Sequence, residues 1–160
     1  MLRIAKPLLA KMHAHLEAGY PHEACGILIG EIEFPRVDLE PALNREQRVP
    51  VKTVHDVILV ENAWTEVNDH ESQLNRFLIS PEDMARADRA AAKLDLDIIG
   101  FFHSHPDHPS RASETDREWA WPVISFVIVS VPHGRAGQTQ SWVLRDDRTQ
   151  FDEEEVVSRQ

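Results

Sequence analysis

The stretch GFFHSHPDHPSRASETD, residues 100–116, joins an apolar run to a dense group of polar side chains. If residues 97–105 form a strand, alternate side chains share a face, so His103 and His105 point the same way, about 6.6 Å apart at ~3.3 Å per residue. Two imidazoles placed in this way can converge on one metal ion. A histidine pair in a strand is also common without any metal, so the pair alone does not decide its role.

The end of the same stretch, SETD, predicts the start of a helix. Ser113 is its expected N-cap, and Asp116 follows three residues later on a neighbouring position of the same face. Such a pair is usually a capping box and nothing more. A catalytic zinc site, however, uses three protein ligands and leaves a fourth position for water. Asp116 is therefore the natural third ligand beside His103 and His105.

Along the rest of the chain, the apolar periodicity and the positions of proline and glycine predict an α/β protein. The polar stretches 31–50 and 62–75 are interpreted as insertion loops, and the acidic tail after residue 145 as frayed. Helices are expected at 7–18, at 80–94 and from 113, and strands at 24–30, 53–61, 76–80, 96–105, 123–131 and 141–145.

Composition narrows the class of protein. The chain has 160 residues, 42% of them hydrophobic, and no repeat, which favours a single domain over 1–160. Its formal net charge of −10, from 27 acidic and 17 basic residues, argues against a nucleic-acid partner. No apolar run reaches the roughly 18 residues of a membrane span. Basic residues also interrupt what would be a signal segment, so we expect a cytoplasmic protein without membrane contact.

The single cysteine, Cys25, limits the metal chemistry. It cannot form a disulfide within the chain or build a cysteine-rich zinc site, so any metal must be held by histidine and carboxylate. Cys25 could serve as a thiol nucleophile, but burial as a small hydrophobic residue is the favoured interpretation.

Taken together, these motifs resemble the signature of the JAMM (MPN-plus) metallopeptidases, which is H-x-H, seven residues, then S-x-x-D. His103, Ser104, His105 and Pro106 begin the match, and Ser113 and Asp116 complete it after the same interval. The family also has a glutamate upstream at the start of a strand. Glu23, in PHEACGILIG (21–30), stands in that position.

The resemblance implies a fold, a cofactor and a reaction. The fold would be α+β, with a curved mixed β-sheet flanked by helices, an MPN/JAMM-like and cytidine-deaminase-like architecture. One Zn²⁺ per chain would be bound by His103, His105 and Asp116. Glu23 would act as general base and then general acid, and Ser113 as oxyanion partner. The implied reaction is hydrolysis of a peptide or isopeptide bond at the Gly-Gly tail of a ubiquitin-like or sulfur-carrier protein.

Two other functions compete with this hypothesis. Non-catalytic MPN scaffolds share the fold but generally lack the metal ligands, which this chain retains. Zinc deaminases also pair a metal with a glutamate, but their signature needs His-x-Glu and Pro-Cys-x-x-Cys, and neither occurs in the sequence. The other histidines match no signature position and are expected not to be ligands: His13, His15, His22, His55, His70, His108 and His133.

Overall fold

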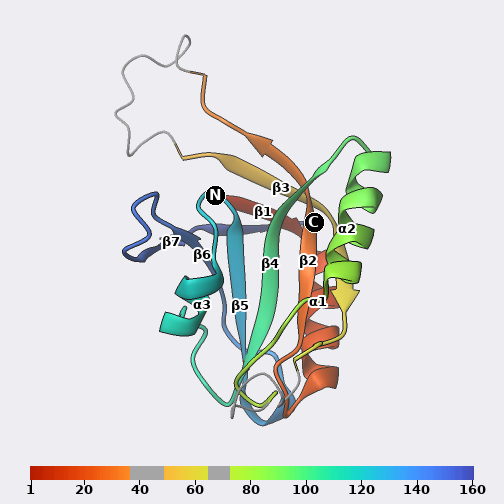
Figure 1. Ribbon diagram of the computed structural model, residues 1–160, viewed down its shortest axis with the longest axis vertical. Helices are drawn as coiled ribbons and strands as arrows, with labels where there is room; N and C mark the ends of the chain where they lie inside the picture. The colour runs from red at the N-terminus through yellow and green to blue at the C-terminus, as the bar shows by residue number, and fades with distance from the viewer. Residues whose placement is uncertain (37–48, 65–72) are drawn as a thin grey trace.

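The computed structural model describes residues 1–36, 49–64 and 73–160, and it contains one eight-stranded sheet with helices on both faces (Figure 1). The elements in chain order are β1 (Leu2–Ala5), α1 (Lys6–Gly19), β2 (Cys25–Glu33), β3 (Val51–Val60), α2 (Pro81–Lys93), β4 (Asp97–Pro106), α3 (Glu114–Trp119), β5 (Ser125–Val131), the 3₁₀ turn η2 (Pro132–Gly134), β6 (Thr139–Leu144), β7 (Phe151–Glu154) and β8 (Val156–Arg159).

The sheet is mixed, with strand order β7-β6-β5-β4-β2-β3-β1-β8. β4 lies between β2, to which it is antiparallel, and β5, to which it is parallel. Both neighbours hydrogen-bond along β4, so the strand that carries the two histidines is an interior one. Rigid interior strands hold side chains more accurately than loops do, and this placement favours a preorganised site.

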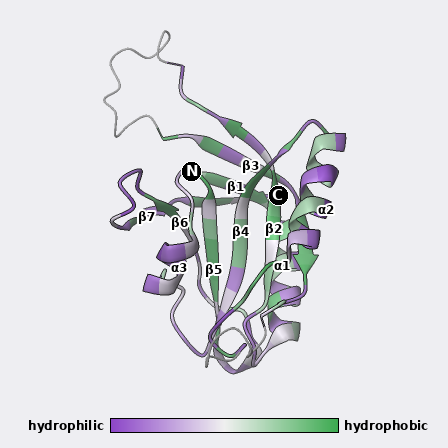
Figure 2. Ribbon diagram, viewed as in Figure 1, coloured by the Kyte–Doolittle hydropathy of each residue, from purple (hydrophilic) through white to green (hydrophobic). Residues whose placement is uncertain are grey.

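The two long helices cover opposite faces of the sheet. α1 buries Met12 and Leu16 against β1, β3 and β5, in a cluster that includes Leu28 and Phe102. α2 packs on β2 and β4 through its buried residues, which are Ala87 and Ala91. Figure 2 shows hydrophobic residues concentrated along the strands and hydrophilic ones on the outer side of α2. No helix in the described ranges is both long and apolar enough to cross a bilayer.

The structure confirms the expected α+β class with a curved mixed sheet, and most expected elements lie within a few residues of their predicted bounds. Ser80 caps α2 as expected, because its side chain accepts a hydrogen bond from the Asp83 amide. Two predictions were wrong. Residues 76–80 form no strand, and the tail that was expected to be frayed contains β7 and β8. In addition, β1 was not predicted, and β2 extends to Glu33, into the predicted loop 31–50.

The tail closes the sheet on itself. β7 pairs with β6 at one edge and β8 pairs with β1 at the other, yet only Glu155 separates β7 from β8. One bent segment therefore forms both edges, and the sheet curves until it is nearly a barrel. Because each edge strand continues covalently into the other, neither is left as a long free edge for other chains to pair with.

A buried ion pair crosses the inside of this curved sheet. The Lys52 ammonium of β3 lies 3.0 Å from Glu154 Oε1 of β7, and both side chains are buried. The hydroxyls of Ser125 and Ser141 donate to Glu154 Oε2 at 2.6 and 2.8 Å. Burial alone would raise the pKa of Glu154, but Lys52 and these hydroxyls hold it below its ordinary value. The carboxylate thus stays ionised inside the fold.

Replacing Lys52 with methionine is expected to lower the free energy of unfolding by about 3 kcal/mol, because it leaves the Glu154 charge buried without its main partner. The matched control is Lys11→Met. Lys11 pairs with Asp56 at 3.2 Å on the surface, and such exposed pairs contribute less than about 1 kcal/mol. Urea unfolding of both variants measures the difference. Equal losses of unfolding free energy in the two variants would show that the buried ion pair stabilises the fold no more than the exposed one.

Candidate functional site

The site lies at the carboxyl end of β4. Side chains alternate along this strand: Phe102 and Ser104 face the α1 side, whereas Phe101, His103 and His105 face the α2 side. The structure therefore brings the two histidines onto one face, as the alternation predicted. The His103 side chain is almost fully buried, and the His105 side chain is mostly so.

Asp116 reaches this face from the first turn of α3. Ser113 is the N-cap of the helix, and the two residues form a reciprocal capping box. The Ser113 amide donates to Asp116 Oδ2 at 2.7 Å, and the Asp116 amide donates to Ser113 Oγ at 3.1 Å. The box fixes the backbone of the turn, and it aims the Asp116 carboxylate at the two imidazoles.

The donor groups of His103, His105 and Asp116 form a compact triangle, in which each carboxylate oxygen of Asp116 faces one histidine. His103 Nε2 lies 3.2 Å from His105 Nε2 and 3.0 Å from Asp116 Oδ1, and His105 Nε2 lies 3.5 Å from Asp116 Oδ2. Ligands about 2.0–2.1 Å from a tetrahedral zinc ion are separated from one another by about 3.3 Å. These nearest separations are close to the spacing that zinc requires, one donor atom from each residue lies within 4.8 Å of the others, and the nitrogen and oxygen donors suit that ion. In the described ranges, this is the only such cluster of histidine, cysteine and carboxylate groups.

Hydrogen bonding prepares His105 and Asp116 for ligation. His105 Nδ1 lies 2.8 Å from the carbonyl oxygen of Pro109, which can only accept, so Nδ1 carries the proton and Nε2 of the neutral ring has a free lone pair. Burial would raise the pKa of Asp116, but while the two histidines are protonated, the charge of His103, hydrogen bonds from both rings and one from the Ser113 amide hold it far below its ordinary value. Asp116 is therefore ionised at neutral pH.

Glu23 precedes the first residue of β2 and is 8% exposed. Burial raises the pKa of its carboxyl to about 7, against an opposing effect of the nearby His103, His105 and Arg76. A carboxyl group with this pKa can both accept and release a proton at neutral pH, as a general acid–base residue must. Burial rather than a neighbouring acid is the main cause of the shift.

Ser113 differs in one respect from its expected role. Its hydroxyl accepts from the Asp116 amide, as foreseen, but it also donates to Asp116 Oδ2 at 2.8 Å. A hydroxyl has a single proton to donate. In this structure Ser113 therefore cannot also donate to a substrate oxygen unless the hydroxyl turns away from Asp116.

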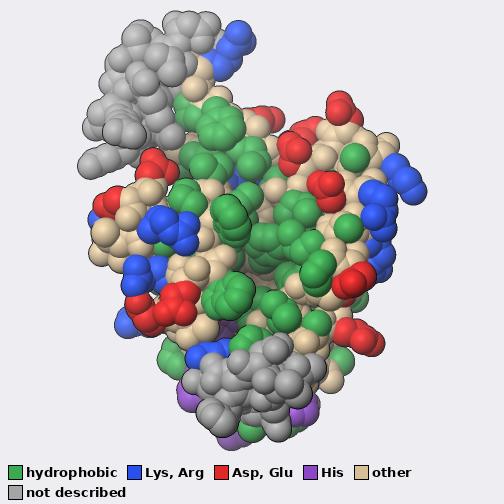
Figure 3. All heavy atoms as spheres, viewed as in Figure 1, with side chains coloured by type: hydrophobic (Ala, Val, Ile, Leu, Met, Phe, Trp, Pro, Cys, Tyr) green, Lys and Arg blue, Asp and Glu red, His purple; other side chains and the backbone are tan. Residues whose placement is uncertain are grey.

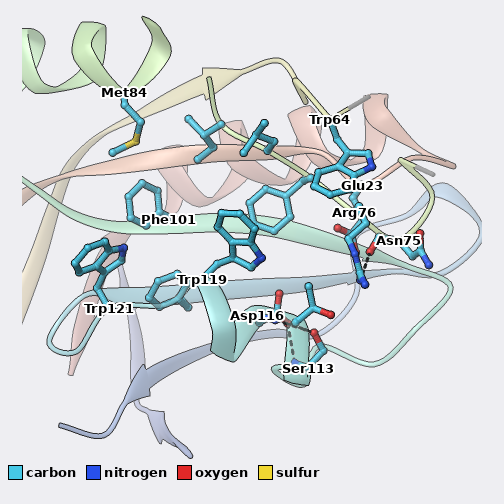
Figure 4. A pocket seen from close by; sticks show the side chains of 15 residues that line it. Glu23, Trp64, Asn75, Arg76, Met84, Phe101, Ser113, Asp116, Trp119 and Trp121 are labelled. Atoms are coloured by element: carbon cyan, nitrogen blue, oxygen red, sulfur yellow. Dashed lines mark hydrogen bonds between the residues drawn. The ribbon is translucent and has the colours of Figure 1, made fainter. Parts of the chain in front are cut away.

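A groove of about 270 Å³ connects these groups to an apolar surface. Figure 4 shows Glu23, Asp116 and Ser113 at one end of it and Phe101, Met84 and Trp121 at the other, with Trp119 between them. The groove lies over β4 and β5 between α2 and α3, where Figure 3 shows hydrophobic side chains gathered in a hollow. Trp119 and Trp121 are 64% and 67% exposed, which is unusual for such large apolar side chains.

Several neighbours of the site escaped the sequence analysis. Phe77 stacks on His103, and the Asn62 amide contacts the backbone of Glu23. Asn62 belongs to the stretch 62–75, which was expected to be a mobile loop, and Phe77 follows that stretch. The described ends of the stretch, 62–64 and 73–75, are instead held by hydrogen bonds. The rest of that prediction lies outside the described residues. The sequence EWAW (118–121) carried the one usable signal, two tryptophans beside the candidate helix.

The competing thiol hypothesis has no support. Cys25 is fully buried, and burial raises the pKa of its thiol to about 12, so it is not a nucleophile at neutral pH. His108, three residues after His105, is exposed and lies outside the triad. His13 and His15 contact Thr139 and the Cys25 carbonyl instead. His70 lies outside the described residues.

The curved mixed sheet and the convergent His–His–Asp triad define a class, an α+β protein with a potential metal centre at the end of an interior strand. More specifically, the chain belongs to the family described as prokaryotic homologs of the JAB domain, whose sequence model matches residues 5–145. This membership confirms the resemblance to compact JAMM-type proteins that the motifs indicated.

Three curated relatives are 26–29% identical to this chain over the aligned residues. A desampylase of Pyrococcus furiosus is 29% identical over 102 residues, which are 61% of this chain and 69% of the relative. A probable TtuB-protein conjugate cleaving protease of Thermus thermophilus is 26% identical over 129 residues, 79% of this chain and 70% of the relative. A desampylase of Haloferax volcanii is 29% identical over 116 residues, 72% and 66% of the two chains.

Two solved structures have the same fold over nearly the whole chain. A Desulfitobacterium hafniense protein studied in solution superposes with a TM-score of 0.74 at 25% identity, covering 99% of this chain and 93% of its own. A Salinibacter ruber protein, also in solution, gives 0.66 at 30% identity, covering 98% and 91%. The likeness extends well beyond the segment that carries the triad.

Proposed function

We propose that the protein is a zinc-dependent isopeptidase that hydrolyses the amide bond after the C-terminal Gly-Gly of a ubiquitin-like or sulfur-carrier protein. The observation that carries this proposal is the convergence of His103, His105 and Asp116, whose nearest donor atoms lie 3.0–3.5 Å apart, together with a buried glutamate that lines the same groove as Asp116. We propose one zinc ion per chain, held by these three residues.

The protein groups divide the chemistry between them. When bound there, zinc would polarise the scissile carbonyl and lower the pKa of water. Glu23 takes a proton from the attacking water as the new carbon–oxygen bond forms. It then gives that proton to the nitrogen of the leaving amine as the carbon–nitrogen bond breaks. The Ser113 hydroxyl turns from Asp116 to donate to the oxygen on which negative charge develops.

The groove suits an extended tail. Its lining is polar near Glu23 and Asp116, where a glycine would offer the least steric hindrance, and apolar farther away. Trp119 and Trp121, the exposed aromatic side chains, would bury part of their surface against apolar side chains upstream of the glycines. The tail would lie over the interior strands β4 and β5, so side-chain contacts rather than pairing with a sheet edge would hold it.

The structure also bears on which loop could hold the folded body of the substrate. Trp64, Asn75 and Arg76, at the described ends of the 62–75 stretch, line the groove. The 34–50 connection instead leaves from the far end of the nine-residue strand β2, roughly 30 Å from Glu23 at ~3.3 Å per residue. We therefore propose that the stretch 62–75 contacts the substrate body.

The family supports this proposal at the level of reaction class. One relative is named for cleaving protein conjugates, and two are named desampylases. The alternative is a non-catalytic scaffold with the same fold. It is disfavoured because a scaffold has no need of a carboxyl group with a pKa of about 7 beside three convergent ligands.

A paired cleavage assay tests the proposal. A small β-grasp protein is fused to a reporter, and the intact mass of each fusion is followed over time. The β-grasp protein ends in either Gly-Gly or Ala-Ala, and each version is joined to the reporter by either a peptide bond or a lysine isopeptide bond. We expect cleavage after Gly-Gly only, complete loss with a chelator, and recovery with added zinc. Equal cutting of Ala-Ala, or cutting that survives chelation, would contradict it. A zinc-loaded protein that cuts none of the fusions would favour the scaffold.

A further inference from the structure

The side-chain amide of Asn62, two residues after the end of β3, makes four hydrogen bonds. Its Nδ2 donates to the carbonyl oxygens of Glu23 and Arg76, both at 2.9 Å. Its Oδ1 accepts from the amides of Trp64 and Leu78, both at 3.0 Å. Two donors and two lone pairs are the whole capacity of a primary amide. Asn62 is thus fully used in joining three backbone segments.

Other hydrogen bonds join the same segments. The Glu23 amide donates to the carbonyl of Gln73 at 2.7 Å, and the Ala63 amide donates to the carbonyl of Leu78 at 2.8 Å. The Gln73 side chain donates to the carbonyls of Asn62 and Trp64 at 3.2 and 2.7 Å. The main chain of Glu23 is therefore held at both its N–H and its C=O by residues 62–64 and 73–78, which we name the Asn62 arm.

The arm also carries an aromatic ring that stacks on His103, one of the proposed metal ligands. Phe77 stacks on His103 with 4.4 Å between ring centroids and 23° between planes. His105 has its Nδ1 fixed by the Pro109 carbonyl, but His103 Nδ1 is buried and has no hydrogen-bond partner among the described residues. For His103, the stacked ring takes the place of the hydrogen bond that usually orients a metal-ligating imidazole.

Asn62 contacts the backbone on both sides of Phe77, at the Arg76 carbonyl and the Leu78 amide. Its other bond reaches the Glu23 carbonyl. One amide thus fixes both the residue proposed to move the proton and the ring that holds a proposed ligand. Its own side chain is occupied by backbone groups and has no atom left for water or substrate.

We infer that Asn62 is a positioning residue of the site, which holds Glu23 and, through Phe77, the His103 ring in register with the other metal ligands. Its effect on catalysis rests on the proposed function, whereas its effect on the His103 ring does not. The inference predicts that isosteric loss of the two donated hydrogen bonds disturbs zinc affinity and turnover together.

Asn62→Asp is the most informative variant, because it preserves the shape and the oxygen that accepts from Trp64 and Leu78, but it places a carboxylate oxygen against the carbonyls of Glu23 and Arg76. We expect zinc affinity, measured by chelator competition, to fall about 10- to 100-fold, as is typical when an outer-shell partner of a metal ligand is lost. The kcat should fall with KM nearly unchanged, because Asn62 does not touch substrate. Zinc affinity and kcat that both stay within about twofold of wild type in the folded variant would overturn the inference.

Phe77 provides a second pair of variants that does not depend on how Asn62→Asp folds. Phe77→Tyr retains the ring, whereas Phe77→Leu retains apolar bulk without a planar face. We expect the leucine variant to lose about 10-fold in zinc affinity and the tyrosine variant to stay near wild type. If both variants bind zinc alike, the stacking has no positioning role and the inference fails.

A readout without metal separates this inference from the proposed function. In the metal-free protein, the ring current of Phe77 should shift the NMR resonances of the His103 ring protons. If Asn62 positions Phe77, the Asn62→Asp variant should move these His103 resonances toward the values that they have in Phe77→Leu. The resonances of the exposed His108 should stay in place. Unmoved His103 resonances would refute the positioning role. If wild type shows these shifts and binds zinc but cuts no conjugate, the proposed function fails and the inference stands.

Discussion

Replacing Glu23 by glutamine is expected to lower kcat about 10²- to 10⁴-fold, the usual contribution of a general acid–base residue. Glutamine has the size and shape of glutamate, but it can neither take a proton from water nor return one to the leaving nitrogen. Zinc content should stay at the wild-type level, because Glu23 lies outside the triangle of ligand atoms. Elemental analysis of the variant beside a Gly-Gly cleavage assay measures both quantities. A kcat near wild type would remove Glu23 from the mechanism.

The same variant has a second signature that does not involve catalysis. Burial raises the pKa of Glu23 from 4.5 to about 7, so the folded metal-free protein binds this proton more tightly than the unfolded chain. Wild type therefore loses stability as pH rises from about 4.5 through 7, where the buried carboxyl must ionise. Glutamine cannot ionise. We expect metal-free Glu23→Gln to unfold at a higher temperature than wild type at pH 8, and the difference to vanish at pH 4.

These opposite effects of one substitution have a common physical origin. An apolar surrounding destabilises the Glu23 carboxylate, and the same surrounding brings its pKa close to the pH at which proton transfer is most effective. The fold tolerates this cost because the Asn62 arm and β2 hold the Glu23 backbone in place. Stability lost at a functional residue and recovered elsewhere is typical of active sites.

Local sequence patterns predicted most of the fold. The central strands are apolar runs, and α2 has its N-cap, proline and apolar face within one continuous segment. β7 and β8 could not be found in this way, because each is only four residues long and three of the four residues of β7 are acidic. Glu154 is buried there only because Lys52, far away in the sequence, lies 3.0 Å from it. The tail forms two strands because β6 and β1 pair with it, and not because of its own sequence pattern.

The candidate site was predictable to the extent that it is local. Two histidines two residues apart share a face of any strand, and Ser113 with Asp116 forms a capping box in any helix start. Glu23 came only from the family resemblance, since nothing near it in the sequence indicates burial. Asn62 and Phe77 could not be predicted, because their roles depend on contacts with Glu23 and His103 that only the folded chain creates.

Replacing His105 by alanine should abolish both zinc binding and activity, and His108→Ala should change neither. His105 contributes one of three nitrogen and oxygen donors, and among the described residues no further histidine, cysteine or carboxylate belongs to this cluster. Loss of a ligand should weaken zinc binding by more than the roughly 100-fold typical of outer-shell losses. His108 is exposed and outside the triad, which makes it a control for removing a histidine from the same loop. Zinc bound per chain after gel filtration, measured beside Gly-Gly cleavage, separates the two variants. Full zinc occupancy in His105→Ala, or equal losses in both variants, would show that the triangle of His103, His105 and Asp116 is not the metal site.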